Sequence, residues 1–389
     1  MTAEIDFFHL DLRKFLAPEF VFGENARFQA ASYCKKLGGR KVFLVTDAGL
    51  LKTRWVNEIE SGLNDQKIEF DVYSKVSPNP RESEVMAGAE EYRRSNCNII
   101  LALGGGSVID CAKGIGIVIS NHGDIKQFEG VDNIARPMPP LVCIPTTSGA
   151  SADVSQFAII NNKEKGYKMA IISKAVVPDI SLIDPVVLTT MDDFLTSCTG
   201  MDALCHAFEA YVSNASSSVT DLFALKAIKL LNENLVLCLN DPLNIQTRGK
   251  VMLASLYAGL AFSNASLGCV HAMAHSLGGY LDLPHGECNA ILLPHVVNYN
   301  FDAAIEKYSH IAHEIGWPGN SQISAREFLF EYLQNLKKEL RIFSTLGKLG
   351  VTDEIILHLA EKAIDDPCNA TNPRPPEKKD LEDIYHAAL

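Results

Sequence analysis

The sequence is short of charged residues and lacks the patterns that mark export or membrane insertion. Only 21% of the 389 residues are charged and the formal net charge is −12, so the protein repels polyanions such as nucleic acid and anionic membranes. No run of about 18 apolar residues occurs, so we expect no membrane span. Residues 1–9 have no basic region followed by an apolar core, so we expect no secretory signal. A small, neutral molecule is the expected ligand.

Cysteine pairs are also absent. The ten cysteines are scattered singly, with no C-x-x-C spacing, and a chain of this length needs no disulfide framework. We therefore expect reduced thiols and a cytoplasmic location. What the chain does contain is 47% hydrophobic residues. Its length also exceeds the size at which a single hydrophobic core usually stops growing. Two domains are the expectation.

Apolar patterning divides the chain into two halves. The first half alternates short apolar runs with helical patterns, which is typical of a parallel sheet flanked by helices. From about Asp192 onward, apolar residues recur every three or four positions, which is typical of helices. We predict an α/β domain over residues 1–188 and an all-helical domain over residues 189–389. The predicted strands cover residues 41–46, 67–73, 98–103, 141–144 and 180–183.

A glycine-rich turn follows the third predicted strand. Gly104, Gly105, Gly106 and Ser107 separate that strand from a helix predicted over residues 108–118. Glycine lets the backbone approach a bulky anion, and the helix N-terminus offers unpaired N–H groups, so the turn suits a pyrophosphate. The run does not match the G-x-G-x-x-G dinucleotide fingerprint. An ordinary strand-to-helix turn is the alternative.

Two acidic residues of the predicted α/β domain have structural interpretations, and one of them, Asp47, has a functional interpretation as well. Asp110 lies three residues after Ser107, which is the spacing of a capping box. Asp47 ends an earlier predicted strand. It could accept hydrogen bonds from the ribose of adenosine and disfavour a phosphate there, or it could simply cap a turn.

Potential metal ligands occur in the second half as two pairs, each spaced by four residues. Asp202 and His206 form one pair, and His271 and His275 form the other; residues four apart project from one face of a helix. His285 follows in a turn. A buried histidine satisfied by the backbone is the alternative for each residue alone, but three of the eleven histidines fall within residues 271–285. This clustering favours a divalent metal site, and imidazole and carboxylate ligands suit Zn²⁺ or Fe²⁺.

Taken in order, these motifs resemble the iron-containing alcohol dehydrogenase family, also called group III. The resemblance covers nearly the whole chain. It implies a dehydroquinate synthase-like fold, in which NAD or NADP binds in the cleft between an α/β dinucleotide-binding domain and an all-α domain. It also implies a homodimer or larger homo-oligomer. The segments that carry it are residues 78–80, 104–113, 145–147, 200–206, 270–294 and 372–374.

The resemblance further implies roles for individual residues. The metal ligands would be Asp202, His206, His271 and His285, with His275 unligated beside the reacting centre as the catalytic residue. His275 would join a proton relay or, equally, support a ligand through a hydrogen bond. Cofactor contacts would come from Asp47, Asn79, Gly105, Gly106, Ser107, Thr146, Thr147 and Lys168.

The reaction expected from the resemblance is reversible hydride transfer between NAD and a small primary alcohol or aldehyde. NADP is the less favoured cofactor. Fe²⁺ is the favoured metal, with Zn²⁺ as the alternative, and it would lower the pKa of the alcohol oxygen.

One segment departs from the family pattern. After two threonines the family commonly has Gly-Thr-Gly-Ser-Glu, whereas this chain has Gly149, Ala150, Ser151, Ala152 and Asp153, followed by a predicted strand over residues 154–157. Hydroxyl groups are lost at 150 and 152, and the carboxylate at 153 is shortened. The change motivates one alternative function, a dehydrogenase-like regulatory or sensor protein with weak catalysis.

A second alternative keeps the fold and changes the chemistry, as in dehydroquinate synthases and glycerol phosphate dehydrogenases. Those enzymes need a strongly basic pocket for an anionic substrate. Few arginines lie near the proposed ligands in the sequence, and Arg248 is the nearest candidate.

Overall fold

The computed structural model describes residues 12–319 and 323–389. The strands predicted over residues 41–46, 67–73, 98–103, 141–144 and 180–183 assemble, together with the unpredicted strand Glu19–Phe22, into one parallel sheet. The order of the strands is β1-β9-β6-β4-β2-β3. Along β4, Ile99 and Leu101 point into one buried cluster and Ile100 points into another, because successive side chains alternate between the faces of a sheet. The strands are β1 (Glu19–Phe22), β2 (Lys41–Val45), β3 (Glu69–Tyr73), β4 (Ile99–Gly104), β6 (Leu141–Pro145) and β9 (Ile180–Ile183).

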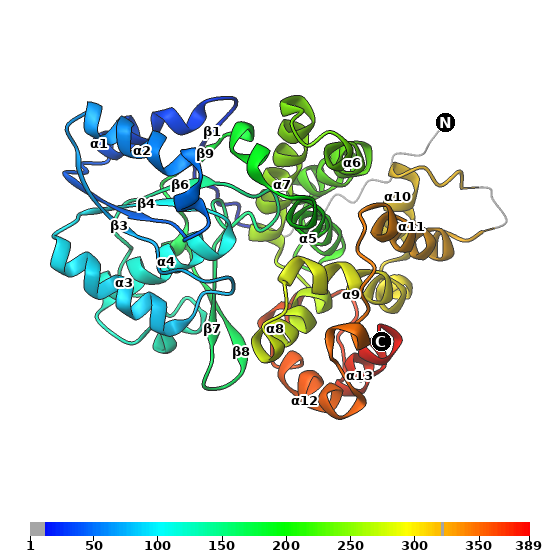
Figure 1. Ribbon diagram of the computed structural model, residues 1–389. Coiled ribbons are helices and arrows are strands. Elements are labelled where there is room, and N and C mark those ends of the chain that lie inside the picture. Colours follow the sequence, from blue (N-terminus) through cyan, green and yellow to red (C-terminus); the bar gives the residue numbers. More distant parts are fainter. Residues whose placement is uncertain (1–11, 320–322) are drawn as a thin grey trace.

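Helices cover both faces of this sheet (Figure 1). Trp55 and Ile59 pack from α2 into the cluster on one face, and Ala89 and Ile115 pack from α3 and α4 into the cluster on the other. The α/β helices are α1 (Ala30–Lys36), α2 (Arg54–Asp65), α3 (Glu82–Ser95) and α4 (Gly106–Asn121). This arrangement leaves the carboxyl ends of the strands free to line a ligand site.

A second, three-stranded sheet was not predicted. It contains β5 (Gly130–Val131), β8 (Tyr167–Ile172) and β7 (Phe157–Asn162), and β7 and β8 form an antiparallel hairpin. The strand predicted over residues 154–157 is wrong except at its last residue. Ser151 has a left-handed φ of 49° and its carbonyl accepts the N–H of Val154, so the chain makes a turn there and becomes extended only at Phe157.

The second domain is helical throughout the residues that the structure describes after β9. Its central helix is α5, which is buried all around its circumference, as a helix enclosed by other helices is. The buried side chains include Ala203, Leu204, Cys205 and Ala207. The helices are α5 (Asp193–Val212), α6 (Ser218–Asn240), α7 (Ile245–Ala265), α8 (Cys269–Leu281), α9 (His285–Asn300), α10 (Ile305–Glu314), α11 (Ala325–Glu339), α12 (Asp353–Ala363) and α13 (Lys378–Ala387).

No single helix in the described ranges is long and apolar enough to cross a membrane, although α7 and α8 pass that test together across a bend of 100°. Residues 1–9, on which the expectation of no secretory signal rests, lie outside the described residues.

The two domains meet where α8 packs on β8 (Figure 1). Gly279 makes this contact possible, since a Cβ at that position would lie 2.3 Å from the Cα of Tyr167. The 3-10 helix η5 (Pro185–Thr190) links the last strand to α5, and the predicted boundary between residues 188 and 189 falls within it. The helical domain is therefore held against the hairpin as well as joined by the linker.

Candidate active site

A cleft of about 820 Å³ runs between the two domains and brings together residues that are far apart in the sequence. The glycine-rich turn lines its α/β side and the histidines line its helical side. Every residue predicted to bind cofactor or metal lines this one cleft, as does the predicted catalytic residue His275. The cofactor and metal residues are Asp47, Asn79, Gly105, Gly106, Ser107, Thr146, Thr147, Lys168, Asp202, His206, His271 and His285.

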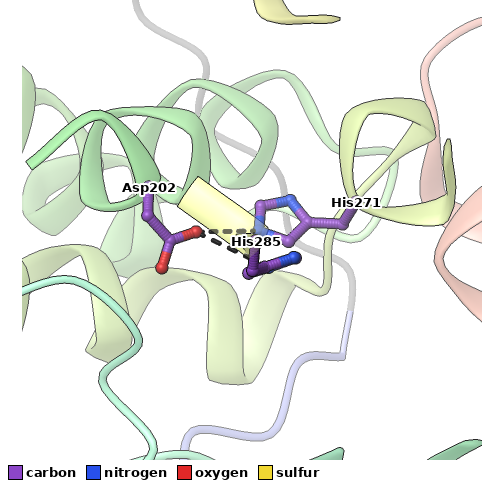
Figure 2. Close-up of side chains that lie close together, drawn as sticks. All are labelled: Asp202, His271 and His285. Carbon is purple, nitrogen blue, oxygen red and sulfur yellow. Dashed lines mark ion pairs between the residues drawn. The ribbon is translucent and has the colours of Figure 1, made fainter. Parts of the chain in front are cut away.

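The acidic centre of the helical side is Asp202, and three imidazoles surround it. Its Oδ1 atom lies 3.6 Å from Nε2 of His271, 3.7 Å from Nε2 of His285 and 3.8 Å from Nε2 of His206. Figure 2 shows Asp202 facing His271 and His285, and one potential ligand atom from each of these three residues lies within 4.8 Å of the others. His206 is outside that group of three but contacts its carboxylate.

Three helices supply these side chains. Asp202 and His206 lie one turn apart on α5, as their spacing predicts, while His271 lies on α8. His285 is the first residue of α9, so it is at a helix start where we predicted a turn. Its neighbour Gly286 packs so closely on α5 that a Cβ would lie 2.2 Å from the carbonyl oxygen of Cys198. This contact brings the start of α9 to Asp202.

Hydrogen bonds orient two of the imidazole rings. Glu209 accepts from Nδ1 of His271 at 2.6 Å and from the backbone N–H of Val270 at 2.6 Å. The carbonyl of Gly149 lies 3.2 Å from Nδ1 of His206. With Nδ1 engaged, Nε2 is the nitrogen left for a metal ion, which is the usual arrangement around metal-binding histidines.

The charges of the cluster also fit a cation. Burial raises the pKa of Asp202, but the surrounding imidazoles outweigh it and hold that pKa well below its ordinary value. Burial lowers the pKa of His206 to about 3 and, with Lys168, lowers that of His285 well below its ordinary value. Burial also lowers the pKa of His271, but hydrogen bonds to Asp202 and Glu209 raise it to about 9 overall. A carboxylate beside the neutral imidazoles of His206 and His285 suits a divalent metal, and a bound cation would displace the second proton of His271.

Asn289 is a member of this cluster that the sequence analysis missed. Its Nδ2 lies 2.7 Å from Oδ1 of Asp202 and 3.2 Å from Nε2 of both His271 and His285. Asn289 follows His285 by four residues on α9, so helical spacing was the signal that could have found it.

His275 lines the cleft beside this cluster. Its ring stacks on that of His285 with centroids 5.5 Å apart, and its Nδ1 lies 2.8 Å from Oδ2 of Asp366. The Asp366 carboxylate thus fixes the ring through Nδ1, and Nε2 makes no hydrogen bond to any of the residues that the structure describes. Asp366 is 91 residues further along the chain, and nothing in the local sequence marks it.

The glycine-rich turn differs from its prediction in one detail. Gly105 is the N-cap of α4, with no side-chain cap hydrogen bond, so the capping box predicted for Ser107 and Asp110 is wrong. The helix begins at Gly106, two residues earlier than that box requires. A Cβ on Gly106 would lie 2.5 Å from the Cβ of Ala150, so the first turn of α4 sits directly on the segment that departs from the family pattern.

Asp47 caps a turn, as its structural interpretation expects. Its Oδ1 accepts the backbone N–H groups of Gly49 at 2.7 Å and Leu50 at 2.9 Å, which caps the turn. The residue also lines the cleft. Asn79 crosses the cleft, because its amide donates to Oδ1 of Asp282 in the helical domain at 2.9 Å.

The departing segment is built into the junction between the domains. The Ser151 hydroxyl donates to the carbonyl of Ser255 on α7 at 2.7 Å, and Asp153 accepts from the Ser181 hydroxyl at 2.5 Å. Ala150 and Ala152 line the cleft. The rewritten residues therefore place methyl groups in the cleft and move their polar contacts to the protein interior.

Arg248 does not supply a basic pocket. Its guanidinium is fully buried and donates to the Thr196 hydroxyl and the carbonyl of Pro242. Among the residues that the structure describes, no arginine lines the cleft, which argues against chemistry on a strongly anionic substrate.

The pKa of Asp110 provides a test of the cleft's electrostatics. Burial raises it to about 7, against the opposing effects of Lys113 and Lys168. Because the folded-state pKa lies above the unfolded value, the contribution that protonated Asp110 makes to folding stability is fully present below about pH 4. This contribution is lost as the pH rises through 7. The free energy of unfolding of Asp110→Asn, relative to that of the parent protein, should therefore rise by about 1–2 kcal/mol from pH 5 to pH 8, allowing for screening in the open cleft.

Urea unfolding of both proteins at the two pH values measures this gain. The exposed Asp65, changed to asparagine, serves as the control and should show no such gain. If the stability of Asp110→Asn relative to the parent protein is the same at both pH values, the pKa of Asp110 is not raised.

Comparison with known proteins identifies the relatives of this chain. Residues 17–185 match the family described as iron-containing alcohol dehydrogenase, and residues 196–389 match the C-terminal domain of the same family. The chain belongs to the iron-containing alcohol dehydrogenase family.

Individual relatives agree with this assignment. The chain is 39% identical over 372 residues to a 1,3-propanediol dehydrogenase of Citrobacter freundii, covering 95% of this chain and 96% of the relative. It is 35% identical over 377 residues to an NAD-dependent methanol dehydrogenase of Bacillus methanolicus, covering 96% and 99%. A crystal structure of a 1,3-propanediol oxidoreductase superposes with a TM-score of 0.94 at 39% identity, covering 97% and 100%. The predicted family, fold class and activity as an alcohol dehydrogenase are confirmed.

Proposed function

We propose that this alcohol dehydrogenase oxidises small primary alcohols with NAD⁺ and a divalent metal, in a reaction that also runs in reverse. The observation that carries the proposal is the single cleft lined by both the glycine-rich turn and the cluster around Asp202. A nucleotide on the turn and a substrate at the cluster would share one enclosed space, which hydride transfer requires.

The residues have distinct roles in this proposal. Asp202, His206, His271 and His285 would hold the metal, and Fe²⁺ is favoured over Zn²⁺ by the family's character. A bound metal would supply Lewis acidity that lowers the pKa of the substrate hydroxyl. The first turn of α4, with Gly105, Gly106 and Ser107, would bind the pyrophosphate through its backbone N–H groups.

His275 is the proposed proton carrier. Its Nδ1 is committed to Asp366 at 2.8 Å, so Nε2 is available to take a proton from the alcohol directly or through a water molecule. The alternative, in which His275 only supports a ligand through a hydrogen bond, predicts a smaller loss of activity on substitution.

The direct test is turnover by protein reloaded with metal. Protein stripped with a chelator and reloaded without oxygen with Fe²⁺ or Zn²⁺ should reduce NAD⁺ in the presence of ethanol, butan-1-ol or propane-1,3-diol. Elemental analysis of freshly purified protein identifies the native metal. Absence of turnover with every short alcohol and aldehyde would contradict the proposal.

A preference for NAD over NADP follows from Asp47. Its carboxylate in the cleft would accept from the adenosine ribose and repel a 2′-phosphate. Asp47→Asn keeps an oxygen for the N–H groups of Gly49 and Leu50 but removes the charge. We expect kcat/KM with NADP⁺ to rise and that with NAD⁺ to fall, shifting the cofactor preference by about tenfold or more.

Initial rates with both cofactors measure this shift. Asp124→Asn is a matched control, since Asp124 caps a turn in the same way, accepting the N–H of Lys126 at 2.9 Å, outside the cleft. An unchanged cofactor preference in Asp47→Asn would assign Asp47 to the turn alone.

The regulatory alternative is favoured only by the departing segment. A sensor would bind NAD⁺ or alcohol without turning over. Titration calorimetry with NAD⁺, compared with initial rates on the same sample, separates the two functions.

We also propose a homodimer or larger assembly and a cytoplasmic location. Strand β1 lies at one end of the described sheet and exposes Phe20 and Phe22, a combination that proteins usually cover. All ten cysteines are free and buried, which supports a reducing compartment. Light scattering after size exclusion measures the assembly.

A further inference from the structure

Two phenylalanines form an apolar wall next to the metal cluster. Phe262 of α7 stacks on His206 with ring centroids 4.2 Å apart and an interplanar angle of 20°. Phe157, the first residue of β7, meets Phe262 edge-on at 5.7 Å. Both phenylalanines line the cleft. We call this pair of phenylalanines the aromatic wall. The His206 ring stacks on Phe262 of the wall and also on His271, whose ring centroid lies 4.5 Å away.

The aromatic wall is held rigidly from behind. The buried ammonium of Lys113 donates to the carbonyl oxygens of Ser155 at 2.9 Å and Phe157 at 2.7 Å. Gln156 bonds twice to Ser263 on α7, through its backbone N–H and its side-chain amide. These contacts tie β7 of one domain to α7 of the other, so Phe157 and Phe262 keep a fixed spacing.

The cleft lining contributes other apolar side chains besides the aromatic wall. Ala150, Ala152 and Leu267 also line the cleft and are apolar. Polar and charged groups line the cleft as well, among them Asp110, Lys168 and Asn161, whose buried Oδ1 atom has no hydrogen-bond partner among the described residues. Because Phe262 stacks on His206, a proposed metal ligand, the aromatic wall lies beside the point where the substrate oxygen would bind and within reach of the carbon chain.

We propose that the aromatic wall selects primary alcohols with an apolar carbon chain and rejects those with a second hydroxyl group. The inference rests on the proposed function, because it concerns the substrate of the same site. A second hydroxyl placed against the two rings loses its hydrogen bonds to water and gains none.

The test compares two alcohols of the same size. Butan-1-ol and propane-1,3-diol have equal numbers of heavy atoms and differ only in a terminal methyl or hydroxyl group. With metal-loaded protein and saturating NAD⁺, we expect kcat/KM for butan-1-ol to exceed that for the diol by about 10- to 100-fold. Equal values, or a preference for the diol, overturn the inference while leaving the proposed function intact. No turnover of either alcohol overturns the proposed function itself.

A matched pair of variants assigns the selection to the wall. Phe157→Leu and Phe157→Asn introduce side chains of nearly the same shape, one apolar and one able to hydrogen-bond. We expect the leucine variant to keep the preference for butan-1-ol and the asparagine variant to reduce it by about tenfold. Equal ratios in the two variants overturn the role of Phe157. Thermal melting checks that both fold, and if the asparagine variant does not, the wild-type ratio alone decides.

Discussion

Replacing Asp202 with asparagine should abolish both metal retention and alcohol oxidation. Oδ1 of Asp202 is the atom that the three Nε2 atoms surround at 3.6–3.8 Å, and an amide there removes the charge that holds a cation. Because a bound metal contributes several kcal/mol to the transition state, kcat/KM should fall by about 1,000-fold or more. Elemental analysis of the purified variant should find well under one ion per chain.

The control for this variant is Asp193→Asn on the same helix. Asp193 lies in the first turn of α5, with a half-exposed side chain paired to Arg341 at 2.6 Å, away from the cluster. It should retain metal and activity. Full metal content in Asp202→Asn would show that Asp202 is not a ligand.

Glu209→Gln should weaken metal binding although Glu209 is not itself expected to touch the metal. The carboxylate accepts two hydrogen bonds, from Nδ1 of His271 and from the N–H of Val270. A glutamine has one acceptor and one donor, so it satisfies Val270 only by presenting its NH₂ group to Nδ1 of His271. The proton of His271 must then move to Nε2, the nitrogen needed for the metal. The opposite orientation of the amide leaves two donors facing each other at Val270.

Competition with a chromogenic chelator measures this loss directly. We expect the metal affinity of Glu209→Gln to fall by about 10- to 100-fold, as for other groups that orient a ligand. Glu58→Gln removes a carboxylate from an ion pair with Arg27 in the α/β domain and should leave the affinity unchanged. An unaltered affinity in Glu209→Gln would mean that His271 holds its orientation by packing alone.

Local sequence patterns predicted most of the elements that build the site. The strand that precedes the glycine-rich turn was predicted over residues 98–103 and is Ile99–Gly104, because its apolar side chains are buried on both faces. The four-residue spacing of Asp202 and His206 placed both on one side of α5. Such features depend on residues within one or two turns of each other, which is the range that periodicity reports.

What the sequence could not predict depends on distant contacts. Glu209 and Asp366 orient His271 and His275 across 62 and 91 residues, and no local pattern links such pairs. The strand expected over residues 154–157 is a turn at first, because Ser151 is bonded to α7 about 100 residues later. The β7–β8 hairpin was also missed, although its strands are neighbours in the chain and pair from Phe157 with Ile172 to Asn162 with Tyr167.

The hydrogen bond between the Gly149 carbonyl and Nδ1 of His206, at 3.2 Å, has a consequence for how binding to this protein must be measured. Gly149 lies two residues after Thr147 in the segment expected to contact the nucleotide, and His206 is expected to contact the metal. One hydrogen bond thus joins the two binding sites. Any displacement of that segment by a nucleotide reaches His206, and thermodynamic linkage makes the effect mutual and equal in size. A nucleotide affinity measured on metal-free protein therefore describes a different equilibrium from the one at which the loaded enzyme works.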